Sequence, residues 1–125
     1  MMSGIKGKDT KPELVVRRYL HSRGLRFRLH VRDLPGRPDL VFPKFSAVVQ
    51  VQGCFWHRHK GCPLAYTPAS NRAFWLKKLR DNARRDTRND RQLRALGWRV
   101  ISVWECEVRD GSSLIWLDRA IRRRN

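Results

Sequence analysis

The chain has 125 residues, which is enough for one compact domain with a single core and too few for two. Its 28 Lys and Arg residues outnumber 11 Asp and Glu residues, which gives a net charge of +17 and a pI near 11.4. This imbalance favours a polyanionic partner, nucleic acid first, over a basic surface that serves only solubility. Apolar stretches are short, and no signal or lipidation motif appears, so we expect a cytoplasmic protein rather than one held at a membrane.

The first half of the chain predicts one helix followed by three strands. A capping box with proline in the first turn begins at Thr10 and starts a helix over residues 11–23. Alternation of apolar and basic residues predicts a strand over 25–30, and a turn rich in Pro and Gly separates it from a strand over 39–42. Residues 47–51 are apolar enough to form a central strand.

The second half predicts a loop, a long helix, a strand and a last helix. Residues 52–70 contain Gly, Pro and potential metal ligands and should form a loop. No Pro or Gly interrupts residues 71–96, which predict a helix, and alternation over 98–104 predicts a strand before a helix within 112–123. Helices thus precede, interrupt and follow a short mixed sheet. The predicted fold class is α/β, an α+β sandwich in a single domain of residues 1–125.

The cysteines predict a metal site. The chain has three cysteines, which cannot all pair with one another, so reduced thiols or metal ligands are favoured over disulfides. Cys54, His59 and Cys62 are spaced like ligands, and Cys106 supplies a fourth. Three thiolates and one imidazole suit a closed, tetrahedral structural site, so we predict one Zn²⁺ that ties the loop to the end of the last strand. The alternative is that Cys106 is an ordinary buried residue and the loop binds nothing.

Two carboxylates and the remaining loop histidine form a second candidate site. Asp39 follows a Pro-Gly-Arg-Pro turn at the start of a strand, where a rigid backbone can present the carboxylate to Mg²⁺. His57 lies outside the zinc set and can accept a proton from an attacking water. Glu13 joins them only if folding brings its carboxylate near Asp39. Turn hydrogen bonds for Asp39 and the capping box for Glu13 are the structural alternatives.

The long helix is dense in basic side chains, and residues three or four positions apart share a face. We expect much of this helix to lie along DNA phosphates, although such runs are ordinarily solvated faces. The basic residues are Lys77, Lys78, Arg80, Arg84, Arg85, Arg88 and Arg91.

Five separated motifs carry a resemblance to a known family. They are Lys-Asp-Thr-Lys-Pro-Glu at 8–13, Leu-Pro-Gly-Arg-Pro-Asp at 34–39, Gly-Cys-Phe-Trp-His at 53–57, Phe-Trp-Leu at 74–76, and Gly-Trp-Arg-Val through Trp-Glu-Cys at 97–106. In this order they resemble the very short patch repair endonucleases, which are bacterial DNA mismatch nicking enzymes with a core related to that of type II restriction enzymes. The resemblance covers nearly the whole chain.

The resemblance implies a reaction and assigns residues to it. The implied reaction hydrolyses one phosphodiester on the 5′ side of a thymine mispaired with guanine and leaves a 5′-phosphate and a 3′-hydroxyl. The family's metal-binding aspartate falls on Asp39, its catalytic histidine on His57, and the acidic residue near its hydrated Mg²⁺ on Glu13. Its zinc ligands fall on Cys54, His59, Cys62 and Cys106. Its wedge aromatics, which enter the base stack at the mispair, fall on Phe55, Trp56 and Trp75.

Other positions match polar residues that contact DNA in the family, or depart from its pattern. Lys78, Asn82 and Asp86 recur at one-turn spacing near the wedge and match polar positions of the family, whereas Arg84 and Arg85 belong to the basic helix. Gln52 stands where family members often carry a histidine that assists at the active site, so this helper is neutral here. Core packing is the alternative for each aromatic, and it fits Phe74 and Trp98 better than Phe55 and Trp56, which lie in the polar loop of the predicted metal site.

The predicted function is a strand-specific, Mg²⁺-dependent nickase for T:G mispairs in double-stranded DNA. We expect a monomer associated with the nucleoid through DNA, with other repair proteins among its partners. One alternative is a zinc-stabilised DNA-binding module without cleavage. Another is a related nicking nuclease with a different target context.

Overall fold

The computed structural model describes residues 10–57 and 59–123. Lys8 and Asp9 of the first motif lie outside the described residues. No helix in the described ranges is both long and apolar enough to cross a membrane.

A four-stranded mixed sheet forms the centre of the fold, in the order β1, β2, β3, β4. The strands are β1 (Arg28–Leu29), β2 (Leu40–Phe42), β3 (Ala47–Gln52) and β4 (Arg99–Trp104). β1 and β2 pair antiparallel, as do β2 and β3, whereas β3 and β4 run parallel. The long connection between β3 and β4 contains the candidate metal loop and the long helix.

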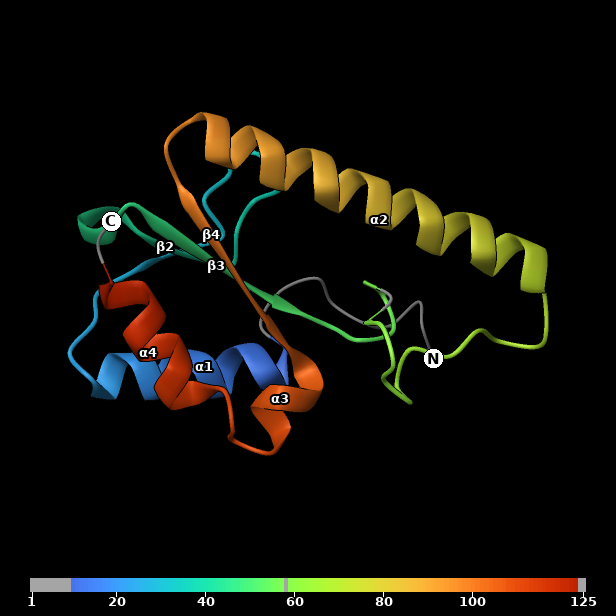
Figure 1. Ribbon diagram of the computed structural model, residues 1–125, viewed down its shortest axis with the longest axis horizontal. Coiled ribbons are helices and arrows are strands. Elements are labelled where there is room, and N and C mark those ends of the chain that lie inside the picture. The colour runs from blue at the N-terminus through green and yellow to red at the C-terminus, as the bar shows by residue number, and fades with distance from the viewer. Residues whose placement is uncertain (1–9, 58, 124–125) are drawn as a thin grey trace.

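Helices cover both faces of this sheet (Figure 1). On one face lie α1 (Lys11–Ser22), α3 (Glu105–Arg109) and α4 (Leu114–Arg122), and on the other lies α2 (Arg72–Ala95). The predicted arrangement of a short mixed sheet flanked by helices is therefore confirmed. A 3-10 turn, η2 (Pro43–Phe45), joins β2 to β3.

The main hydrophobic core lies between the sheet and the three-helix face. It is built from α1, α4 and the inward side chains of β2, β3 and β4, including Val16, Leu20, Phe42, Val49 and Leu117, all fully buried. A smaller cluster on the opposite face joins α2 to the sheet through Leu93, Val41 and Val48. Burial of a side chain of this size contributes about 1.5–3 kcal/mol, so the three-helix face is the better anchored of the two.

The predicted helices and strands match the structure except in three details. The predicted strand over 25–30 is only the pair Arg28–Leu29, because His30 takes a left-handed backbone conformation with φ 46° and ends it. The five-residue helix α3 was not predicted and carries Cys106 beyond the strand. Phe74, expected in the core, is 59% exposed, whereas Trp98 packs on the smaller cluster as expected.

Candidate active site and metal centre

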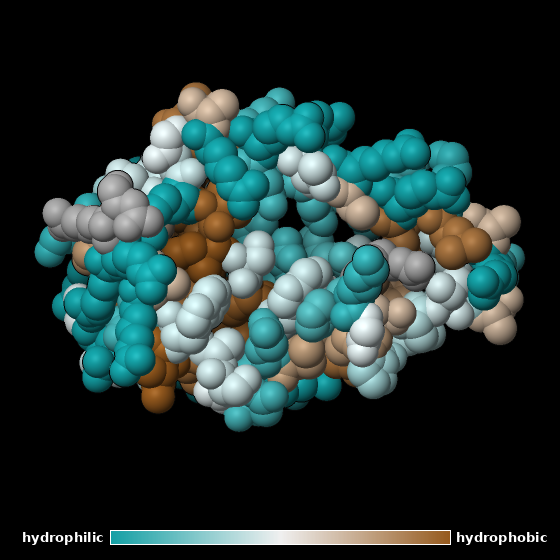
Figure 2. Space-filling model, viewed as in Figure 1, coloured by the Kyte–Doolittle hydropathy of each residue, from teal (hydrophilic) through white to brown (hydrophobic). Residues whose placement is uncertain are grey.

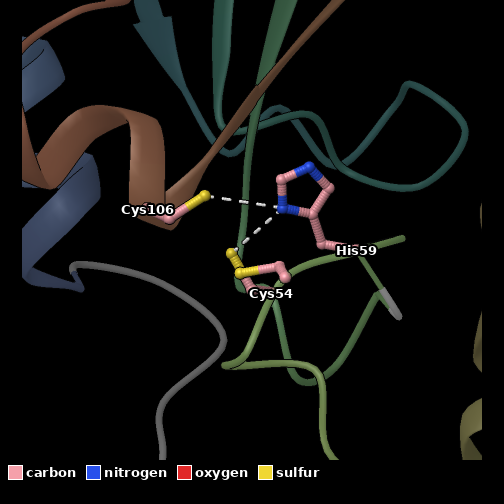
Figure 3. Close-up of side chains that lie close together, drawn as sticks. Cys54, His59 and Cys106 are labelled. Atoms are coloured by element: carbon pink, nitrogen blue, oxygen red, sulfur yellow. Dashed lines mark hydrogen bonds between the residues drawn. The ribbon is translucent and has the colours of Figure 1, made fainter.

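The four predicted zinc ligands come together at the ends of β3 and β4. Cys54 follows β3, His59 and Cys62 lie in the loop beyond it, and Cys106 lies in α3. The ligand atoms of these four side chains all lie within 4.8 Å of one another. Figure 3 shows Cys54 and Cys106 directed at the imidazole of His59.

The distances in this cluster fit a tetrahedral ion. Nδ1 of His59 lies 3.5 Å from the Sγ of Cys54 and 3.5 Å from the Sγ of Cys106. An ion at about 2.3 Å from sulfur and about 2.1 Å from nitrogen requires a sulfur-to-nitrogen distance of about 3.6 Å in tetrahedral geometry. The His59 ring stacks on Trp104 at 4.1 Å between centroids with 6° between planes, which fixes its orientation.

The protonation of the thiols depends on whether an ion is bound. Burial raises the pKa of Cys54 to about 12 and also raises the pKa of Cys106, so without an ion both prefer to stay protonated. A backbone hydrogen bond from Leu64 lowers the pKa of Cys62. A bound metal ion deprotonates the thiols that coordinate it, and its binding energy then adds to the stability of the fold.

A second cluster combines Glu13, His30 and Asp39, whose ligand atoms also lie within 4.8 Å of one another. The Glu13 carboxylate is buried, accepts from Arg17, and lies 2.9 Å from Nε2 of His30. The expected closeness of Glu13 to Asp39 is therefore present, and the carboxylate points into the molecule rather than lying free at the helix end. His30 was not identified from the sequence.

Asp39 is held rigidly and is poorly solvated. Its Oδ2 accepts a hydrogen bond of 2.7 Å from the backbone N–H of Val51, on the neighbouring strand β3. Burial, assisted by the nearby charge of Glu13, raises the pKa of Asp39 to about 7, although the Val51 hydrogen bond opposes the shift. A carboxylate kept from water in this way is suited to bind a cation, which compensates the charge that burial penalises.

His57 is paired with an acidic side chain of α2. Its Nδ1 contacts a carboxylate oxygen of Asp86, and its backbone N–H donates to the carbonyl oxygen of Gly53 at 3.1 Å. This arrangement fixes the ring and leaves Nε2 as the nitrogen that can exchange a proton. Asp86 thus lies beside the candidate base rather than on a surface free to read DNA.

Two adjoining clefts contain these groups. The first, of about 430 Å³, lies between α2 and β3. The molecule is visibly hollowed in this region, between α2 and the rest of the chain (Figure 2). The residues that line this first cleft include His30, Arg32, Arg37, Asp39, Gln50, Gln52, His57, Asp86 and Asn89. The second cleft, of about 1210 Å³, is lined by aromatic side chains. Val51, Gln52 and His57 line both clefts, so His57 lies where they meet, whereas Asp39 lines only the first.

The three wedge candidates form one aromatic cluster along the second cleft. Phe55 lies 5.2 Å from Trp56 and 5.8 Å from Trp75 between ring centroids, and Tyr66 packs on Phe55 at 5.1 Å. Phe55 is only 8% exposed, whereas the two tryptophans are half-buried and line the cleft. In this structure Phe55 therefore supports the two indole rings.

The basic residues of α2 divide between two faces. Lys78 and Asn82 line the aromatic cleft, close to the catalytic candidates. Arg84 lies in a separate shallow groove, whose other basic residues are Arg80, Arg88 and Arg91. With 100° between successive helical residues, this groove lies on the far side of α2 from Asn82. Hydrophilic side chains accordingly cover the outside of α2 in Figure 2, and one DNA segment cannot contact both faces in the same way.

Gln52 is buried at the junction of the two clefts. It is 8% exposed, and its Nε2 donates to Oε1 of Gln50 at 3.3 Å. The sequence also missed Asn89, which lines the first cleft from α2 and contacts the turn at Gly36. A Cβ at Gly36 would lie 2.9 Å from the Asn89 amide, so the turn before Asp39 packs directly on α2.

Comparison with known proteins gives one consistent set of relatives. The family described as DNA mismatch endonuclease Vsr matches residues 1–63. Type II nicking enzyme V.XorIIP of Xanthomonas oryzae pv. oryzae is 48% identical over 91% of this chain and 83% of its own length. Type II nicking enzyme V.NmeAIP of Neisseria meningitidis is 42% identical over 88% of this chain and 78% of its own. DNA mismatch endonuclease Vsr of Escherichia coli is 42% identical over 98% of this chain and 77% of its own.

The buried carboxylate of Asp39 generates a prediction about stability. The folded chain retains the Asp39 proton up to a pH near 7, whereas the unfolded chain releases it near 3.8. The free energy of unfolding therefore decreases, by at most about 1.4 kcal/mol per pH unit, as the pH rises through this interval, and the loss is constant above it. Asp39→Asn removes the charge and keeps an acceptor for the Val51 N–H.

We expect Asp39→Asn to be more stable than the wild type without added divalent ion, by more at about pH 8 than at about pH 5.5. Urea unfolding at the two pH values measures the difference. Asp33→Asn, an exposed position on the preceding loop, is the control and should show no pH-dependent gain. A variant at position 39 that is less stable than the wild type at both pH values would contradict the argument.

Proposed function

The chain belongs to the Vsr DNA mismatch endonuclease family, and from this premise we propose that it nicks DNA 5′ of the thymine in a T:G mispair, with Mg²⁺ as the catalytic ion. Family membership makes the protein a DNA endonuclease, and DNA is its partner. The mispair, the ion and the residue roles are the proposal. The observation that carries it is that Asp39, clustered with Glu13, lines the same cleft as the His57–Asp86 pair, and that this cleft adjoins an aromatic cleft at His57.

The proposed reaction is hydrolysis of one phosphodiester. Water attacks phosphorus, the bond from phosphorus to the 3′ oxygen of the preceding nucleotide breaks, and that oxygen leaves as a 3′-hydroxyl after taking a proton from solvent. His57 accepts the proton of the attacking water at Nε2, while Asp86 holds the ring through Nδ1 and stabilises the imidazolium. Asp39 and Glu13 would hold Mg²⁺, which supplies positive charge for the pentavalent phosphate.

The aromatic cleft supports recognition of a mispair. Trp56 and Trp75, with Phe55 behind them, present flat apolar surface beside the catalytic groups. Opening a base step costs a few kcal/mol and costs least at a mismatch, so an aromatic wedge itself favours mispaired DNA. Lys78 and Asn82, which line the same cleft, are placed to contact the strand that enters it.

The proposed zinc ion keeps this wedge in position. Residues 53–57 and 59–71 form a loop that contains no helix or strand. The four-ligand cluster fixes both ends of the aromatic segment, because Cys54 precedes Phe55 and His59 follows His57. We assign zinc a structural role, since four protein ligands leave no position for substrate.

A second candidate function is a nickase that recognises the mispair in a different flanking sequence. Family resemblance suggests a T:G mispair within CTWGG, where W is A or T. Two of the three relatives described above are named type II nicking enzymes, and the third is named a DNA mismatch endonuclease. We therefore include other contexts around the mispair in the experiment.

The proposed function predicts that the protein makes a single cut in mispaired DNA. On a labelled duplex with T:G in CTWGG, denaturing gels should show one Mg²⁺-dependent nick 5′ of the mispaired thymine and none in the paired duplex. Asp39→Asn should lower the nicking rate by about a thousandfold or more while mismatch binding is retained, because the ion is lost and the wedge is not. A panel of flanking contexts follows if this duplex is bound but not cut. Unchanged nicking by the variant would exclude the proposed metal site.

The His57–Asp86 pair gives the second prediction. Asp86→Asn should lower the single-turnover rate by about a hundredfold, because the imidazole loses the carboxylate that stabilises its protonated form. Asp81→Asn, on the same helix but exposed and paired with Lys77, is the matched control and should leave the rate unchanged. Equal rates for both variants would show that Asp86 does not assist His57.

The third prediction concerns zinc content. Purified protein should contain about one zinc per chain by elemental analysis, as a closed Cys3His site requires. His59→Ala should lose the metal and melt at a lower temperature, whereas His21→Ala, an exposed position on α1, should keep both. A well-folded wild-type protein without zinc would overturn the assignment.

A further inference from the structure

The cluster around Asp39 contains a nitrogen donor that the proposed mechanism does not use. Nε2 of His30 lies 2.9 Å from Oε2 of Glu13 and 3.9 Å from Oδ1 of Asp39. The three side chains come from different parts of the fold: Glu13 from α1, His30 after β1, and Asp39 before β2. Their side chains are 2%, 20% and 17% exposed, so the cluster is largely shielded from water.

The backbone of His30 is held in a costly conformation that directs its ring inward. Its φ of 46° lies in the left-handed region, which is unfavourable for a side chain of this kind by about 1–2 kcal/mol. Its N–H donates to the backbone carbonyl of Asp39 at 3.1 Å, so the conformation is fixed by the same hairpin that carries the aspartate. Strain of this kind persists where the surrounding structure imposes it, and functional sites are common among such places.

The charges in the cluster are not balanced from within. Two carboxylates converge, and Arg17 pairs with Glu13 on one side. Asp39 has no arginine or lysine partner among the described ion pairs, and its carboxylate contacts the Val51 N–H, the Glu13 carboxyl group and the imidazole of His30. A divalent cation between the two carboxylates would supply the missing charge.

We propose that the catalytic divalent ion is bound directly by three side chains, Glu13, His30 and Asp39, with Nε2 of His30 as its one nitrogen ligand. This inference rests on the proposed function for the ion's role in nicking and goes beyond it in the ligand set. Adjacent donors around an octahedral ion at about 2.1 Å are about 3.0 Å apart, and opposite donors about 4.2 Å. The distances from His30 to Glu13 and Asp39 lie within this range.

The nitrogen changes which metal the site prefers. Mg²⁺ favours oxygen ligands and retains its water, whereas Mn²⁺ and Co²⁺ accept imidazole readily. A site of two carboxylates and one imidazole therefore binds Mn²⁺ more tightly than Mg²⁺. Three further octahedral positions remain for water and a phosphate oxygen. The ion of choice in this chain is then Mn²⁺ wherever both are available at comparable concentration.

Binding of Mn²⁺ to the zinc-loaded, full-length protein tests the ligand set without reference to activity. Pulsed EPR of bound Mn²⁺ should show coupling to a ¹⁴N nucleus, and this coupling should vanish in His30→Asn. Asparagine tolerates the left-handed backbone, so this variant preserves the hairpin. Calorimetry should show that the variant loses about tenfold in Mn²⁺ affinity and much less in Mg²⁺ affinity. His21→Asn, on the exposed surface of α1, is the matched control and should behave as the wild type.

The outcomes separate this inference from the proposed function. Bound Mn²⁺ without ¹⁴N coupling, or with coupling that persists in His30→Asn, overturns the ligand set even if T:G duplexes are nicked. Nitrogen coupling that depends on His30 supports the ligand set even if no mispair is cut, in which case only the proposed substrate fails. If His30→Asn unfolds, histidine-selective ¹⁵N labelling of the wild type replaces it, and a ¹⁴N signal unchanged by the label overturns the inference.

Discussion

The parallel register of β3 and β4 determines where the candidate metal ligands and catalytic groups of this protein lie. Gln52, the last residue of β3, pairs with Trp104, the last residue of β4. The carboxyl ends of both strands therefore lie at the same end of the sheet, and Cys54 and Cys106, which follow them, lie side by side. A slip of one residue would reverse every side chain of a strand and separate the thiols. The same strand supplies the Val51 N–H that holds Asp39, so one register aligns the metal loop with the carboxylate cluster.

The candidate active-site region is stabilised by elements that lie outside it. The hydrophobic core on the three-helix face anchors α1, from which Glu13 projects, whereas the opposite face is covered by α2 through few buried side chains. This difference leaves space for the first cleft between α2 and the sheet, and the second cleft lies beside it, between α2, the loop after β3 and the start of α1. The fold also holds two poorly solvated carboxylates, Glu13 and Asp39, an unfavourable arrangement without a cation, because the core on the three-helix face supplies the compensating stability.

The sequence predicted which side chains lie together where the signal is local, and it did not predict closeness that depends on strand pairing. Cys54, His59 and Cys62 are close together in the chain, and the use of every cysteine identified Cys106 as well. Asp39 was marked by its turn. His30 was missed because its closeness to Glu13 follows from a two-residue strand and a left-handed residue, neither of which has a periodic signal. The faces of α2 were not distinguished because arginine occurs all around the helix, and only packing shows which side turns inward.

Gln52 contributes no charge to the first cleft, so positive charge there must come from other residues. An amide carries no charge at any pH, so among the described residues lining the first cleft the fixed positive charges belong to Arg32 and Arg37, and the titratable nitrogens to His30 and His57. A phosphodiester in this cleft would be neutralised by guanidinium groups at its rim and by the bound ion. His30, if it binds that ion, is no longer available as a base. Among the described histidines that line the first cleft, His57 would then be the one available for proton transfer, and Asp86 of α2 holds its ring.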